Sequence, residues 1–166
     1  MCYEKLFSHR SYLNYYNIPP EKIVQAVPWY GPNYPCSNNP QKSTDICICP
    51  LPYKTQVDDD QIWNLIELGK SQGYEPVLDS YTKTNKILYK DDQGVVNQVW
   101  FDDSQSLNIK FEAVSLNFGL RGVAAWHGRA LDYSGKFPEK TASIWGTLNQ
   151  VCDELDALRE VNIIDF

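Results

Sequence analysis

The chain has 166 residues, a formal net charge of −6 and 43% hydrophobic residues, values typical of a single globular domain and not of a disordered or fibrous protein. No apolar stretch approaches the ~20 residues of a membrane-spanning helix, so we expect no membrane partner. An acidic chain lacks the basic surface that binds a phosphate backbone, so we expect no nucleic acid either.

The first part of the chain predicts a short helix, a strand and a long loop. Residues 8–17 are polar and aromatic and end before two prolines, which favours a short helix. Residues 22–27 (KIVQAV) are typical of a short strand. Residues 28–57 contain six prolines and three cysteines without hydrophobic periodicity, which predicts a loop.

The middle of the chain predicts a helix followed by a β-hairpin. Three aspartates, residues 58–60, begin a helix that runs to about Gln72, and acids at that end suit the helix dipole. We therefore interpret them as capping residues and not as metal ligands. Residues 81–89 and 95–101 alternate loosely around the turn-forming sequence Asp-Asp-Gln-Gly, which predicts a hairpin.

The last part predicts a helix, a strand and a second helix. Asp103 precedes an apolar helical pattern to residue 118, and Gly119 ends it. Residues 121–126 (RGVAAW) are typical of a short buried strand, and residues 141–158 carry a wide apolar helical stripe. With the strand at 22–27, this alternation predicts an α/β protein whose two strands run parallel.

Three of the five cysteines lie in the predicted loop. Cys47 and Cys49 are separated by one residue, whereas zinc sites use about two to four, and no Cys/His pair follows downstream. We therefore expect no metal. A disulfide from Cys36 to either Cys47 or Cys49 would staple the loop and would indicate an oxidising compartment.

Aromatic and acidic blocks follow the two predicted strands and the hairpin. They are Trp29-Tyr30-Gly31 with Cys36, Trp100-Phe101-Asp102-Asp103, and Trp126 with Leu131-Asp132-Tyr133-Ser134-Gly135. In this order, together with Pro52-Tyr53-Lys54, they resemble the C-terminal part of the family 18 glycoside hydrolases, the chitinase-like enzymes, over roughly residues 11–150. The chitobiase-like members are the most similar.

The resemblance implies a (β/α)8 TIM barrel to which this chain contributes about strands seven and eight with their helices. Residues 1–166 then form one partial barrel domain, with 151–166 as the end of the last helix and a tail. Whole barrels run to ~250 residues, so most of the barrel would be missing. No signal peptide is evident in residues 1–10. A lysosomal or extracellular location is implied by the resemblance alone.

The family hydrolyses β-1,4-linked N-acetylglucosamine, in chitooligosaccharides and the chitobiose core of Asn-linked glycans. A glutamate protonates the leaving oxygen, the substrate's own acetamido group attacks, and no cofactor is needed. That glutamate ends an Asp-x-x-Asp-x-Asp-x-Glu motif. The nearest string here, from Asp153 to Glu160, has Leu158 at its sixth place and falls on a predicted helix. We therefore expect the catalytic acid to be absent and the chain to be inactive alone.

Four residues match sugar-contacting positions of the family. Trp126 matches the floor beneath the sugar at the cleavage point, although a core tryptophan is the alternative. Tyr30 and Trp29 match aromatic residues near the same cleft, and burial of Trp29 is as probable as exposure. Asp102 would accept a hydrogen bond from a sugar hydroxyl, hold a neighbouring side chain, or cap the helix. His127 has no triad partner nearby in the sequence.

Three functions agree with this sequence. The first is part of a chitobiase-like hydrolase. The second is a non-catalytic, chitinase-like protein that binds carbohydrate such as chitin. The third is a truncated product without independent function. The partner in the first two is an oligosaccharide that contains N-acetylglucosamine.

Overall fold

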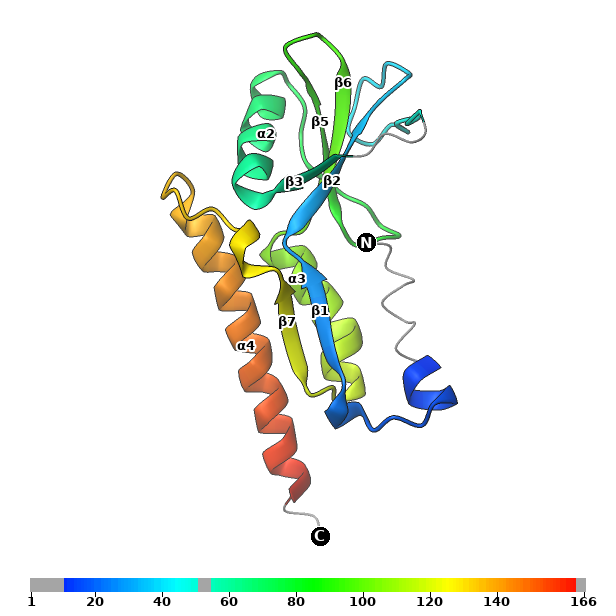
Figure 1. Ribbon diagram of the computed structural model, residues 1–166, viewed down its shortest axis with the longest axis vertical. Helices are drawn as coiled ribbons and strands as arrows, with labels where there is room; N and C mark the ends of the chain where they lie inside the picture. Colours follow the sequence, from blue (N-terminus) through cyan, green and yellow to red (C-terminus); the bar gives the residue numbers. More distant parts are fainter. Residues whose placement is uncertain (1–10, 51–54, 164–166) are drawn as a thin grey trace.

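The computed structural model describes residues 11–50 and 55–163, which form two parts that follow one another along the long axis of the molecule and share one hydrophobic core (Figure 1). The lower part in this view is a pair of parallel strands covered by helices. The upper part is a five-stranded sheet covered by one helix. The chain passes from the first part to the second after the first strand and returns after the hairpin.

The two parallel strands are those that the sequence predicts. β1 (Val24–Pro28) pairs with β7 (Gly122–Trp126) in parallel, with Val24 opposite Gly122 and Pro28 opposite Trp126. β1 begins later than predicted because Pro20–Lys22 forms a 3-10 turn, which suits proline at its first position. Of the predicted helix 8–17, the described part contains the π-helical turn Ser11–Tyr15, and residues 8–10 lie outside the described residues.

Two helices cover one face of this pair. α3 (Ser104–Phe111) continues as a π-helical turn, Glu112–Leu116, and α4 (Pro138–Ile163) follows β7. The helices at 103–118 and 141–158 are thus confirmed, and Gly119 ends the first with a φ of 61°. Asp103 caps α3 in a capping box with Ser106.

The opposite face of the pair is open in the described structure. Val24 and Trp126 are large apolar residues that it exposes, while Gln25 and Val27, on the other face of β1, are buried. The strand predicted at 121–126 is confirmed, but its predicted burial is wrong, because β7 is covered by helices on one side only and its residues are half-buried or exposed.

The second part is an antiparallel sheet with the order β3-β2-β6-β5-β4. Its strands are β2 (Tyr30–Pro35), β3 (Thr55–Asp58), β4 (Val77–Leu78), β5 (Asn85–Lys90) and β6 (Val96–Phe101). β5 and β6 are the predicted hairpin, whose turn uses a positive φ of 78° at Gly94. The sheet as a whole was not predicted.

The prediction of a loop over residues 28–57 is wrong, because β2 lies within this range and β3 begins within it. β2 tolerates its prolines because it pairs with β3 over Tyr30–Asn33 and with β6 over Asn33–Pro35, so most of its residues pair on one side only. A Cβ at Gly31 would lie 2.0 Å from the carbonyl oxygen of Trp100. Glycine therefore allows these two strands to approach.

Helix α2 (Asp59–Ser71), which confirms the helix predicted at 58–72, covers one face of the antiparallel sheet. It approaches closely at Gly69, where a Cβ would lie 2.5 Å from the carbonyl oxygen of Leu88. Part of the other face is covered by the segment from Cys36 to Pro50, in which the Asp45 carbonyl accepts a hydrogen bond from Gln98 Nε2 at 3.5 Å. Ser43 Oγ of the same segment accepts a hydrogen bond from the Leu88 backbone N–H of β5. Among the described residues, no helix is long and apolar enough to cross a membrane.

Candidate functional site

The parallel pairing brings three of the four predicted site residues to the carboxyl ends of β1 and β7. The backbone N–H of Trp29 donates to the carbonyl of Trp126 at 3.1 Å, which extends the pairing just beyond the strands. The peptide bond from Trp126 to His127 is cis. The side chain of Trp126 is 63% exposed, on the face that the helices leave open. Its indole is therefore a surface group and not part of the core.

Trp29 and Tyr30 point in different directions from the same strand end. Trp29 is 4% exposed, and its ring packs edge-on against Trp145 of α4 at a centroid distance of 4.8 Å. Tyr30 is half-buried at the start of β2. Of the two aromatic residues, Tyr30 is thus the more accessible to a ligand, while Trp29 anchors the strand end to α4.

The carboxylate of Asp102 is occupied by an ion pair. It accepts from Lys110 Nζ at 2.5 and 2.7 Å and from Ser106 Oγ at 2.8 Å. The side chains of Lys110 and Asp102 are 1% and 8% exposed, and Lys110 also donates to Thr84 Oγ1 at 2.7 Å. This network ties α3 to the antiparallel sheet. In this structure Asp102 holds a neighbouring side chain, one of the three roles considered for it.

The segment after β7 is organised around Asp132. Its carboxylate accepts from the Ser134 hydroxyl at 2.5 Å and from the backbone N–H groups of Ser134 and Phe137 at 2.8 and 2.6 Å. These hydrogen bonds, chiefly that of the Ser134 hydroxyl, lower the pKa of Asp132. Asp132 therefore fixes the path from Trp126 to the start of α4.

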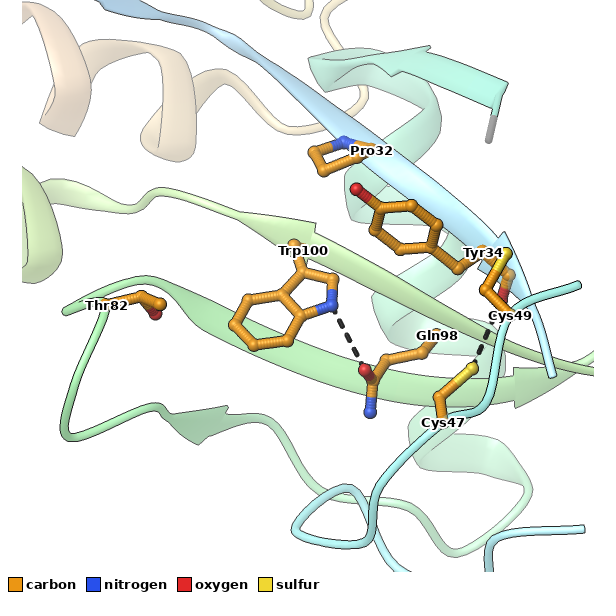
Figure 2. Close-up of a pocket in the computed structure, with 7 residues that line it drawn as sticks. All are labelled: Pro32, Tyr34, Cys47, Cys49, Thr82, Gln98 and Trp100. Atoms are coloured by element: carbon orange, nitrogen blue, oxygen red, sulfur yellow. Dashed lines mark hydrogen bonds between the residues drawn. The ribbon is translucent and has the colours of Figure 1, made fainter. Parts of the chain in front are cut away.

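A separate pocket lies on the antiparallel sheet, on the face away from α2 (Figure 2). Its volume is about 340 Å³. Pro32 and Tyr34 of β2 and Gln98 and Trp100 of β6 form its floor. The sequence does not predict this pocket, because its proline-rich segment indicates a loop. The signal that marks it is the alternation of Tyr30, Pro32 and Tyr34 within that segment.

Two of the five cysteines form a disulfide. Cys36 is bonded to Cys47 with an S–S distance of 2.07 Å, which decides between the two predicted pairings. Cys49 is outside the disulfide and lines the pocket. Residues 11–50 and 55–163 contain no group of three His, Cys, Asp or Glu side chains that could hold a metal ion.

The acidic string near the C-terminus lies on α4, as expected for a helix and not for a strand end. Asp153, Asp156 and Glu160 are exposed, whereas Leu155 between them is buried against the core. These acids therefore line the solvent side of the helix, far along the chain from the ends of β1 and β7.

Trp126 lies at the carboxyl end of paired parallel strands, which is the end where α/β barrels carry their active sites. Comparison with known families identifies the class. The chain belongs to the glycosyl hydrolases family 18, whose family profile matches residues 4–130.

Among curated proteins, di-N-acetylchitobiase of Mus musculus is 34% identical over 146 residues, which are 79% of this chain and 37% of that protein. Di-N-acetylchitobiase of Homo sapiens is 30% identical over 147 residues, 80% of this chain and 36% of that protein. The chain thus spans little more than a third of the length of these relatives.

Among solved structures, this chain is similar to the C-terminal domain of a presumed chitinase from Desulfitobacterium hafniense, with a TM-score of 0.66 and 22% sequence identity. The match covers 90% of this chain and 40% of the chain in that structure. It is also similar to a class V chitinase mutant from Cycas revoluta in complex with (GlcNAc)3, with a TM-score of 0.55 and 24% sequence identity. That match covers 77% of this chain and 35% of the chain in that structure. These similarities support the fold.

Proposed function

We propose that this chain is the sugar-binding end of a chitobiase-like hydrolase and binds oligosaccharides of β-1,4-linked N-acetylglucosamine. The observation that carries the proposal is the exposed indole of Trp126 at the carboxyl end of two parallel strands, with the half-buried Tyr30 two residues beyond the end of β1. A flat indole packs against the C–H face of a pyranose ring, and a phenol beside it supplies a hydroxyl that can hydrogen-bond to the sugar.

We further propose that β1 and β7 are about the seventh and eighth strands of a (β/α)8 barrel. In the described structure they pair with each other only, their outer edges are open, and one face exposes Val24 and Trp126. Parallel strands are normally paired at both edges and covered on both faces. The remaining strands of a barrel would cover this face around Val24 and leave Trp126 at the carboxyl end of the strands, where barrels carry their sites.

In this assignment each residue of the site has a different role. Trp126 forms the floor beneath the sugar, Tyr30 contacts it from the side, and the buried ring of Trp29 holds the end of β1 against α4. A direct contact from Trp29 would require its ring to leave Trp145. Asp102 acts through its ion pair by fixing the junction between α3 and the sheet.

The chain alone is proposed to bind without hydrolysis, because the string nearest to the acidic motif lacks one aspartate and lies on the solvent side of α4. General acid catalysis requires a carboxyl group within hydrogen-bond distance of the leaving oxygen. A lysosomal or extracellular location remains part of the proposal, and the Cys36–Cys47 disulfide is compatible with it.

Isothermal titration calorimetry with N,N′-diacetylchitobiose and longer chitooligosaccharides tests the binding proposal. We expect saturable binding that Trp126→Ala abolishes and that Tyr15→Ala, at an exposed tyrosine remote from the strand ends, leaves unchanged. Hydrolysis of chitobiose by the chain alone would contradict the missing acid, and a flat titration of the wild type would contradict the proposed function.

A further inference from the structure

Three cysteines meet at one end of the antiparallel sheet. Cys36 follows directly after β2 and is bonded to Cys47, and the Sγ atoms of this pair lie 3.9 and 3.8 Å from the carbonyl oxygen of Tyr34. Cys49 keeps its thiol and lines the same pocket as Cys47. Figure 2 shows Cys47 and Cys49 at the same end of this pocket, beside Tyr34. A thiol therefore lies near a disulfide, which is the arrangement that thiol–disulfide exchange requires.

The side chains of residues 46–49 alternate between solvent and the pocket. Ile46 and Ile48 are 80% and 58% exposed, whereas Cys47 and Cys49 are half-buried and both line the pocket. Such alternation is typical of an extended segment, in which residues two positions apart project from the same side. The thiol of Cys49 therefore projects from the same side of the segment as the bond from Cys47 to Cys36.

Hydrogen bonds fix Ile48, the residue between these two cysteines, against the chain that follows Cys36. The backbone N–H and the hydroxyl of Ser37 both donate to the Ile48 carbonyl, at 2.7 and 2.8 Å. The Ile48 N–H donates to Asn38 Oδ1 at 2.8 Å. Because Ser37 is the next residue after Cys36, the two cysteines that flank Ile48 lie on either side of the position that faces Cys36 and Ser37.

Cys36 can therefore bond to either cysteine with little movement of the backbone. The Cα atoms of Cys36 and Cys47 are 5.1 Å apart, within the range of about 4.4–6.8 Å that disulfides span. A bond from Cys36 to Cys49 would close a loop only two residues longer, and the entropy of loop closure changes very little over this difference. The hydrogen bonds of Ile48 can remain in both arrangements.

The electrostatics of Tyr34 give independent support for the position of the Cys49 sulfur. Burial raises the pKa of the Tyr34 phenol, and the negative charge of an ionised Cys49 adds a smaller contribution in the same direction. The Cys49 sulfur therefore lies close enough to interact with Tyr34, the residue whose carbonyl oxygen the two disulfide sulfurs face.

We propose that Cys36, Cys47 and Cys49 form a thiol–disulfide exchange site, in which the disulfide alternates between Cys36–Cys47 and Cys36–Cys49. Cys49 loses its proton to solvent, and its thiolate attacks Sγ of Cys36. The S–S bond to Cys47 breaks as the new bond forms, its electron pair leaves on Cys47 Sγ, and this thiolate takes up a proton. One disulfide and one thiol are present before and after, so no external oxidant or reductant takes part. This site is additional to the proposed function and does not depend on it.

Peptide mass spectrometry of the whole chain tests the exchange. The chain is incubated without added thiol at about pH 8.5 and its thiols are trapped with N-ethylmaleimide, after which tandem fragmentation distinguishes label on Cys47 from label on Cys49. We expect label on both, with at least ~10% on Cys47. Either disulfide isomer, separated by chromatography in acid and returned to about pH 8.5, should regenerate the same mixture. This conversion should be roughly tenfold or more slower at about pH 6.5, because the thiolate is the attacking form.

Two variants serve as controls for the route. Cys49→Ser keeps Cys2 and Cys152, so loss of label from Cys47 in this variant would identify Cys49 as the attacking thiol. Cys47→Ser should form the Cys36–Cys49 disulfide and keep the circular dichroism spectrum of the wild type.

Three results would overturn the exchange site. One is label confined to Cys49 together with a separated isomer that persists at about pH 8.5. Another is a folded Cys47→Ser variant in which Cys36 and Cys49 both remain thiols under oxidising conditions. The third is label on Cys36 in the wild type, which would show attack on Cys47 instead. Each of these results leaves the proposed function unaffected, since that proposal is tested by sugar titrations.

Discussion

The ion pair between Lys110 and Asp102 gives the sharpest energetic prediction. Replacement of Lys110 by methionine keeps a long apolar side chain but leaves the buried carboxylate of Asp102 with Ser106 as its remaining side-chain donor. Two charge-assisted hydrogen bonds to the carboxylate disappear, and the Thr84 hydroxyl loses a donor. Removal of one partner of a buried pair typically costs about 3–5 kcal/mol, a large part of the ~5–15 kcal/mol that stabilises a typical domain.

Urea unfolding followed by circular dichroism measures this loss as a shift of the midpoint at constant m-value. A matched control is Lys70→Met, because Lys70 pairs with Glu67 at 3.3 Å while the two side chains are 43% and 60% exposed, and such pairs are worth about 0–1 kcal/mol. The double variant Lys110→Met, Asp102→Leu should recover much of the stability. A loss from Lys110→Met no larger than that of the control would refute the reasoning.

Two further predictions concern the junction of the strands and the segment after β7. Gly31→Ala should destabilise the chain by roughly 1–3 kcal/mol or more, measured by thermal unfolding, because the new Cβ would meet the Trp100 carbonyl. The control is Gly146→Ala, which should not destabilise the chain because a Cβ there meets no atom within 4 Å. The lowered pKa of Asp132 means that its contribution to stability is present above the ordinary aspartate pKa of 3.8 and is lost as the pH falls through the native value. Ser134→Ala should raise the Asp132 pKa toward that ordinary value, measured by NMR titration, and an unchanged pKa would contradict the assigned cause.

The elements with a clear local signal were predictable from the sequence. Asp103 as a cap, the turn before Gly94 and the apolar stripe of α4 each depend on neighbouring residues, and the structure confirms them. The parallel pairing of β1 with β7 spans almost 100 residues, yet alternation of strands and helices was enough to predict it, because crossover connections follow few geometries.

What the sequence could not show depends on contacts between distant residues. β2 was missed because its prolines indicate a loop, and only its partners β3 and β6 make it a strand. Lys110 has no signal of its own, because its burial depends on Asp102 and on Thr84 from the preceding hairpin. The pocket could not be predicted for the same reason. Tyr34 of β2 and Trp100 of β6 line it together because β2 and β6 are neighbours in the sheet, although they are far apart in the sequence.

The exposure of Trp126 is the feature on which the functional proposal depends. The sequence left open whether Trp126 is a core residue or a surface residue, and in the structure it lies exposed on the uncovered face of the strand pair. Exposure of an apolar ring to water at a strand end is unfavourable in free energy. A ligand or a further part of the barrel that covers the ring would remove this unfavourable contribution.

The most direct test follows the indole N–H signals of the five tryptophans in a ¹H–¹⁵N spectrum, assigned by single substitution, while N,N′-diacetylchitobiose is added. The account predicts a saturable shift of the Trp126 signal, with the buried Trp29 and Trp63 signals little changed. A Trp126 signal that stays in place at saturating disaccharide would contradict the claim that this strand end binds the sugar.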